Sequence, residues 1–194
     1  MAERGIRSIV GLLLKNDLIT KAEYEEFVYV LLGDFESVMV VISILTLGVI
    51  SRRIIPTISF LLCFFSLRKR TGGYHLNTYA GCYICTLCLY LFITKSACYL
   101  MQHINFFVSL AMIAGCIVMM LGSVNHPNMD MGKDELAESA MIARIIVGIE
   151  CLFILSLRWL GNAEMIVVYS GMAIVLCATL LILAKLLRQE VIEE

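Results

Sequence analysis

Two long runs without a charged residue, at residues 106–124 and 165–184, constrain this chain more than any other feature. Each run is close to the roughly 20 apolar residues that a helix needs to cross the hydrocarbon core of a bilayer. Apolar residues make up 60% of the sequence and charged residues only 16%. A soluble domain of this composition would expose large apolar patches, so lipid is the expected solvent.

Four further apolar runs are candidates for spanning helices, at residues 37–50, 54–67, 79–94 and 141–160. The first two are short and are separated only by a Ser-Arg-Arg turn. Either the first extends back through Phe27 and takes Asp34 and Glu36 into its helix, or the two form a shallow hairpin. The third run stops at Lys95, and its helix can extend further if that long side chain snorkels.

The N-terminal region is amphipathic. Apolar residues recur there at helical spacing, at Ile6, Ile9, Val10 and Leu13. This helix either lies among lipid headgroups or packs on the rest of the protein. Thr20 and Glu23 have capping-box spacing and predict the start of a second helix. We therefore predict an all-α polytopic membrane protein with about six transmembrane or re-entrant helices, a single domain over residues 1–194 and an interfacial region over residues 1–36.

The distribution of Lys and Arg predicts the orientation. With six spans and the N-terminus in the cytoplasm, the external segments contain only Arg52, Arg53, Lys95 and Arg158. The cytoplasmic segments contain the other eleven, as the positive-inside rule requires: Arg4, Arg7, Lys15, Lys21, Arg68, Lys69, Arg70, Lys133, Arg144, Lys185 and Arg188. We therefore expect a multi-pass protein of the cell membrane with both termini, and residues 68–78, in the cytoplasm.

One short stretch combines the residue types of a cysteine nucleophile. Arg68 and two further basic residues precede a Gly-Gly pair that ends at Gly73, and His75 and Cys82 follow. A neighbouring imidazole and a positive field both favour the reactive thiolate. In one continuous helix, His75 and Cys82 would be about 10 Å apart along the axis, so the glycines must let the chain fold back.

The other cysteines are interpreted as packing residues. Six of them lie within apolar runs and are expected to be buried free thiols: Cys63, Cys88, Cys98, Cys116, Cys151 and Cys177. Cys82, Cys85 and Cys88 have a spacing typical of metal or iron–sulfur ligands, but the fourth ligand of a ferredoxin motif is missing. We expect Cys85 and Cys88 to lie in the core, and we expect no metal, no other cofactor and no nucleic-acid partner.

The order of Arg68, Gly73, His75 and Cys82 in a small multi-spanning chain resembles the accessory gene regulator protein B family, whose members process quorum-sensing peptide precursors in bacterial membranes. The resemblance extends over nearly the whole chain. It implies a cysteine endopeptidase with His75 as the base and Cys82 as the nucleophile, and no cofactor. Arg68 would recognise substrate or organise the turn, and Gly73 would permit its backbone conformation.

The resemblance also implies the substrate and the product. The partner would be a short amphipathic precursor peptide with an acidic C-terminal tail, bound at the bilayer by a homodimer. Cys82 would cleave off the tail as an acyl-enzyme, and an internal Cys or Ser would close a thiolactone or lactone ring. The usual basic residues of the loop after the fourth span are largely missing at residues 125–132. Asp34, Glu36, Asn77 and Glu135 are candidates for a third catalytic residue, among which spacing does not choose.

A different class of function competes with this one. Arg144 and Glu150 lie within an apolar run and Asp34 just before one, and ionisable residues in membrane helices are functional suspects. The alternative is a small polytopic transporter or exporter without peptidase activity. A membrane scaffold without chemistry is a further alternative.

Overall fold

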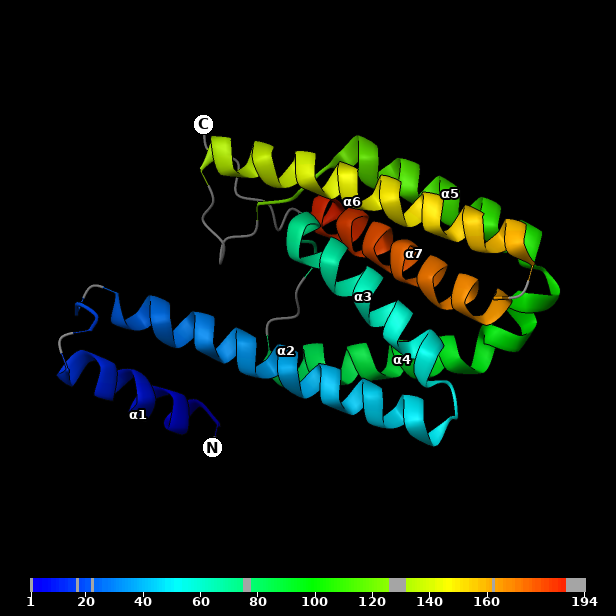
Figure 1. Ribbon diagram of the computed structural model, residues 1–194. Coiled ribbons are helices and arrows are strands. Elements are labelled where there is room, and N and C mark those ends of the chain that lie inside the picture. Colours follow the sequence, from blue (N-terminus) through cyan, green and yellow to red (C-terminus); the bar gives the residue numbers. More distant parts are fainter. Residues whose placement is uncertain are drawn as a thin grey trace. The chain divides into compact units, whose positions relative to one another are not determined.

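The computed structural model describes residues 2–16, 18–21, 23–74, 78–125, 132–161 and 163–187, and every regular element within them is a helix (Figure 1). The helices are α1 (Ala2–Lys15), α2 (Tyr24–Ile50), α3 (Ile54–Thr71), α4 (Tyr79–Gln102), α5 (Ile104–Leu121), α6 (Lys133–Leu160) and α7 (Glu164–Leu186). The prediction of an all-α fold is confirmed.

The chain divides into two compact units, Met1–Ile44 and Leu45–Glu194, and the boundary falls inside α2. We describe each unit by itself. The prediction of a single peptidase domain over residues 1–194 stays a prediction.

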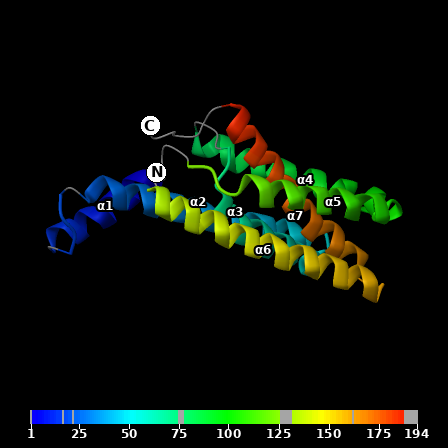
Figure 2. The same ribbon diagram turned by 90° about the horizontal axis from the view of Figure 1, so that it is seen from above.

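In the first unit, α1 packs along the beginning of α2 (Figure 2). Ile6 and Val10 of α1 are buried against Val28 and Leu32 of α2, whereas Ile9 is exposed. Of the two interpretations of this amphipathic helix, packing on the protein therefore holds for Ile6 and Val10. The exposed Ile9 lies outside this contact.

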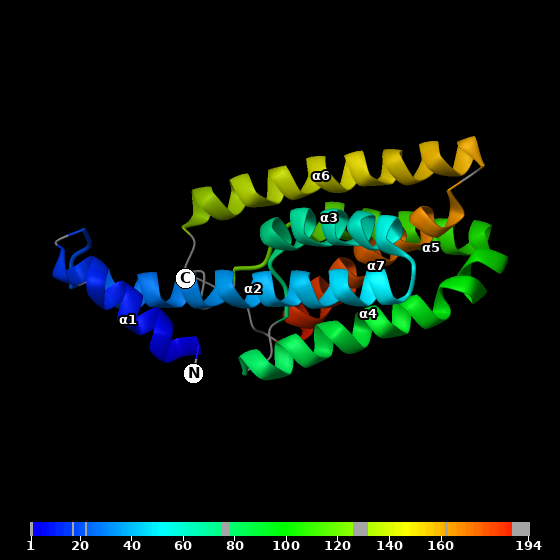
Figure 3. The ribbon, with the colours of Figure 1, turned by 60° about the horizontal axis from the view of Figure 1, so that its bottom comes forward.

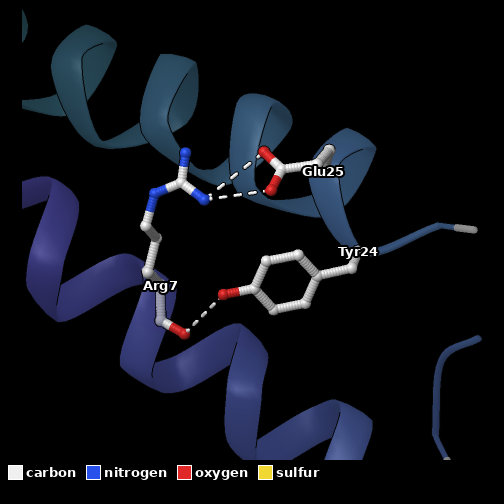
Figure 4. Close-up of polar contacts among 3 residues, drawn as sticks. All are labelled: Arg7, Tyr24 and Glu25. Atoms are coloured by element: carbon white, nitrogen blue, oxygen red, sulfur yellow. Dashed lines mark hydrogen bonds and ion pairs between the residues drawn. The ribbon is translucent and has the colours of Figure 1, made fainter. Parts of the chain in front are cut away.

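Polar contacts join the same two helices (Figure 4). The Arg7 guanidinium donates to the Glu25 carboxylate at 3.0 Å, and the Tyr24 hydroxyl donates to the Arg7 carbonyl oxygen at 3.2 Å. Both side chains of the ion pair are largely exposed, so the pair adds little to stability. It fixes the register of α1 on α2.

The connection into α2 contains one half of the predicted capping box. The Thr20 backbone N–H donates to the Glu23 carboxylate at 2.8 Å, and the Thr20 hydroxyl does so at 2.7 Å. These hydrogen bonds lower the pKa of Glu23. The helix begins at Tyr24, after Glu23 instead of directly after Thr20.

Two alternatives were open for the short runs at residues 37–50 and 54–67. The structure shows the first of them, a helix that extends back through Phe27. α2 is continuous over Tyr24–Ile50 and contains Asp34 and Glu36. It ends at a tight turn in which Arg52 adopts a φ of 56°, an uncommon conformation for a residue with a side chain. α3 begins directly after this turn, at Ile54.

In the second unit, α7 is the central helix and contacts α3, α4, α5 and α6 (Figures 1 and 3). Most of its residues from Val167 to Leu181 are buried. Small residues let the helices approach closely, as is common in membrane bundles. A Cβ on Gly171 of α7 would lie 2.7 Å from the Phe107 ring of α5, so this contact depends on glycine.

Among the described residues, five helical segments are long and apolar enough to cross a membrane: Val30–Ile50, Ala80–Gln102, Ile104–Leu121, Lys133–Leu160 and Glu164–Leu186. The sixth predicted span, in α3, is not among them, and α3 has three basic residues in its last turn. Several passes through a membrane are therefore built into this fold.

α4 and α6 extend well beyond the apolar runs that predicted them. α4 continues beyond Lys95 to Gln102, and Lys95 is exposed on it. Lys is a good helix former, and its long stem keeps the charge away from apolar neighbours. α6 begins at Lys133 with a charged, exposed segment before its apolar part.

Candidate active site

The Gly-Gly pair forms the turn that ends α3. Gly72 has a φ of 63° and Gly73 a φ of 113°, conformations that residues with a Cβ rarely adopt. The space around Gly73 also excludes a side chain. A Cβ on Gly73 would collide with the Arg68 guanidinium and lie 3.2 Å from the Leu180 carbonyl group. Only glycine fits at this position.

Arg68 holds this turn from inside. Its guanidinium donates to the carbonyl oxygen of Gly72 and, at 2.7 Å, to that of Tyr74. A bidentate grip of this kind uses the fixed fork of the guanidinium, which lysine lacks. Of the two roles considered for Arg68, organising the turn is therefore visible in its contacts.

Two other segments support the turn at the same end of the bundle (Figure 3). The Tyr74 N–H donates to the Leu180 carbonyl oxygen of α7 at 3.0 Å. In the segment that follows α5, the Ser123 hydroxyl donates to the Arg70 carbonyl oxygen at 2.6 Å. The Val124 N–H donates to the Thr71 carbonyl oxygen at 3.0 Å. These contacts connect α3, α7 and the segment after α5 into one frame.

Cys82 lies in the first turns of α4. Thr78 is the N-cap of this helix, and its hydroxyl accepts a hydrogen bond from the Gly81 N–H at 3.3 Å. The Cys82 N–H donates to the Thr78 carbonyl oxygen at 3.1 Å, which starts the helical ladder, and the Cys82 side chain is half-buried. The unsatisfied N–H groups of a helix start carry partial positive charge, which favours a thiolate.

Arg68 adds a full positive charge near this thiol. Burial lowers the pKa of Arg68, and electrostatic interactions with Cys177 and Cys82 oppose that shift. Within the described part of the chain, no carboxylate forms an ion pair with Arg68. The charge therefore acts on its surroundings, and a positive charge near Cys82 favours the thiolate over the thiol.

The other half of the predicted pair, His75, is outside the described residues, as is Asn77. Of the remaining candidates for a third residue, Asp34 and Glu36 belong to the first unit. Glu135 accepts a hydrogen bond from the Gly132 N–H at 3.3 Å, so it serves as a cap of α6.

The burial of the remaining cysteines is only partly as predicted. All eight cysteines are thiols and none is in a disulfide. Cys63 and Cys177 are buried and Cys151 is half-buried, but four others are exposed: Cys85, Cys88, Cys98 and Cys116. Burial of these four was a wrong prediction, because a lipid-facing helix surface is as apolar as a protein core.

No group of three potential metal ligands occurs among the described residues. The residues that sequence reasoning missed are Ser123, Val124 and Leu180, which support the turn through backbone atoms and one hydroxyl. Backbone carbonyl and N–H groups leave no sequence signal. Ser123 lies at the end of the apolar run at residues 106–124, and nothing in that position predicted a contact with α3.

The architecture is that of a multi-pass helical membrane protein with a thiol at a helix start, near a half-buried arginine and a glycine turn. Residues 6–187 match the family model of Accessory gene regulator B, which covers nearly the whole chain. The chain belongs to this family and has a role in quorum-sensing peptide processing. No curated protein and no solved structure matches it.

Proposed function

We propose that this protein is a membrane cysteine endopeptidase that removes the C-terminal tail of a precursor peptide and promotes its cyclisation. The observation that carries the proposal is Cys82 in the first turns of α4, next to the positive charge of Arg68. Membership of the family supports the substrate class, an autoinducing peptide precursor. A thiol that is poised as a thiolate is the nucleophile that such chemistry needs.

The reaction has two acyl transfers. The Cys82 thiolate attacks the carbonyl carbon before the tail, a thioester bond forms, and the peptide bond to the tail breaks. His75 gives its proton to the departing amine of the tail. An internal Cys or Ser of the peptide then loses its proton to His75 and attacks the thioester, which closes the ring and releases the Cys82 thiolate. Water must be kept from the thioester, because hydrolysis would release a linear peptide.

Arg68 and Gly73 are positioning residues in this proposal. Arg68 holds the turn through the Gly72 and Tyr74 carbonyl groups, and its charge interacts with Cys82. Gly73 allows the guanidinium to reach that position. The acidic tail of the substrate would bind at this basic end, where Lys69 is exposed and Arg70 half-buried.

The orientation and the assembly belong to the same proposal. With α3 crossing as a sixth pass in addition to the five candidate spans, both termini and the turn lie in the cytoplasm, where the precursor is made. Two copies of the chain form the functional dimer. Reporter fusions after Thr78 and at Glu194 test the orientation, and external signals at both positions would contradict it. Cross-linking in membranes tests the dimer, and a strictly monomeric product would contradict it.

The experiment that tests the activity compares two cysteines of the same helix. Cys82→Ala should abolish release of the tail from a co-reconstituted precursor, whereas Cys98→Ala should retain it. Both variants should insert into membranes equally, which is checked by their recovery in the membrane fraction. Full cleavage by Cys82→Ala, in a preparation free of other proteases, would end the proposal.

One observation favours the rival class, a transporter. Glu150 is buried among apolar helices, where its Oε1 accepts from the Ser66 hydroxyl at 2.9 Å and its Oε2 has no partner within the described residues. Arg144 donates instead to the Met119 carbonyl oxygen at 2.9 Å. If the chain exports peptide, Glu150→Gln should slow release from vesicles and leave tail cleavage unchanged. Unchanged release would remove this argument for transport.

A further inference from the structure

Glu150 is an acidic residue in an otherwise apolar part of α6, between Arg144 and Arg158. It follows Arg144 by six residues (150 − 144) and precedes Arg158 by eight (158 − 150), which is about 9 Å and about 12 Å along the helix. Ile149 and Leu152 next to it are 62% and 68% exposed, whereas Glu150 itself is 7% exposed. The carboxyl group is therefore buried at a level of α6 where the outer surface is apolar.

The hydrogen bonding of this carboxyl group is incomplete. Its Oε1 accepts from the Ser66 hydroxyl of α3 at 2.9 Å, and its Oε2 has no partner within the described residues. The Ser66 hydroxyl has a single hydrogen, and the Leu62 carbonyl oxygen lies closer to it, at 2.6 Å. An ionised carboxylate accepts about four hydrogen bonds. One shared hydrogen bond would leave a negative charge at Glu150 almost unsolvated.

The titratable groups around Glu150 are thiols. Cys63 of α3, Cys177 of α7 and Cys151 of α6 itself interact with it electrostatically. From α5, Cys116 reaches the same region through its interaction with Cys151. A thiol is neutral or negatively charged, so these groups do not compensate for a carboxylate.

The arginines of the neighbouring segments donate to other groups. On α6, Arg144 donates to a backbone carbonyl oxygen of α5, and Arg158 donates to the Asn105 side chain. Arg68 of α3 interacts electrostatically with Cys177 but donates to the glycine turn. A buried carboxylate that lacks both a cation and a full set of donors is strongly disfavoured, and such a group takes up a proton instead.

We propose that Glu150 is a proton-binding site of the second unit: at neutral pH its carboxyl group is a neutral acid, with the proton on the partnerless Oε2. A proton fits better than a metal ion, because a metal ion needs several ligands and no group of three potential ligands occurs among the described residues. The acid keeps an O–H hydrogen that it can donate to a group entering the bundle. The proposal depends neither on peptidase activity nor on transport.

Infrared spectroscopy detects the bound proton, because the carbonyl stretch of a protonated carboxyl group is separate from the carboxylate and amide bands. The full chain is reconstituted in lipid vesicles, and the spectrum of Glu150→Gln is subtracted from that of the wild type. We expect the protonated-carboxyl band in this difference at neutral pH and its loss at strongly alkaline pH. A difference spectrum without this band at neutral pH would overturn the proposal.

Glu138, exposed near the start of the same helix, provides the matched control. Subtraction of Glu138→Gln should give a carboxylate band, and a protonated-carboxyl band there would contradict the role of burial. Sodium chloride at fixed pH should leave the Glu150 band unchanged, and its loss would identify a metal-ion site instead. If Glu150→Gln fails to fold by circular dichroism, Glu150→Asp replaces it and should shift the band. A band that the Asp variant does not shift would also overturn the proposal.

Discussion

Each end of α4 has an arginine, a histidine and a cysteine nearby in the sequence or the fold, but their arrangements differ. Before and within its first turns are Arg68, His75 and Cys82, and near its last turns are Arg53, Cys98 and His103. At the first end, the hydrogen bonds of the arginine to described residues go to carbonyl oxygens of the glycine turn. At the second end, its Nη2 donates to the Cys98 sulfur atom itself, at 3.4 Å.

The surroundings of the two arginines differ as well. A hydrogen bond with Tyr169 raises the pKa of Arg53, whereas burial lowers the pKa of Arg68. The start of a helix attracts negative charge and its end repels it. The two ends of α4 therefore share residue types but differ in the polarity of the helix and in the glycine turn beside Arg68.

The largest difference between the two ends should come from the histidines. His75→Ala should lower the rate of tail cleavage by about 100- to 10,000-fold, because it removes the proposed base. His103→Ala at the other end removes a ring that lies 4.9 Å from the Tyr99 ring and should change the rate by less than about twofold. Single-turnover cleavage measures both. Similar rates in the two variants would break the comparison.

The arginines should differ next. Arg68→Ala should lower cleavage by about tenfold or more and move the alkylation of Cys82 by iodoacetamide to higher pH, because a thiolate loses a nearby cation. Arg68→Lys keeps the charge without the bidentate grip and should be intermediate. Arg53→Ala should leave the Cys82 alkylation profile unchanged. A profile unaffected by Arg68→Ala would mean that the residue supports only the turn.

The glycines should separate stability from activity. Gly73→Ala forces a side chain into a φ of 113° and should cost about 1–3 kcal/mol of stability as well as several-fold in activity. Gly48→Ala, near Arg53, would place a Cβ 2.6 Å from the Thr57 hydroxyl and should destabilise the fold without a specific loss of activity. Thermal unfolding in detergent and cleavage rates per folded molecule make the distinction. Equal losses per folded molecule would contradict it.

The smallest effect is expected from the six thiols that have no chemical role. Simultaneous replacement by Ala should keep cleavage within about twofold, while stability falls because of cavities at Cys63 and Cys177. The replaced residues are Cys63, Cys88, Cys98, Cys116, Cys151 and Cys177. A variant that is well folded by circular dichroism yet inactive would return a metal or disulfide role to consideration.

Much of the fold could be predicted from apolar runs, because in a membrane protein the solvent itself selects long apolar helices. Burial was less predictable, since Cys88 or Cys116 on a lipid-facing surface has the same neighbours in sequence as a core residue. At the site, Arg68, Gly73 and Cys82 could be named from their order. Their support by Leu180 and Val124 could not, because it uses backbone groups that every residue carries.

The central claim is a covalent bond between Cys82 and the precursor. Wild-type protein is mixed with precursor, quenched in acid and digested, and the modified peptide is identified by mass spectrometry. We predict a hydroxylamine-sensitive acyl adduct on Cys82, present in Cys98→Ala and absent in Cys82→Ala. Tail release that proceeds at the full rate in Cys82→Ala, or an adduct on Cys98 instead, would contradict the account.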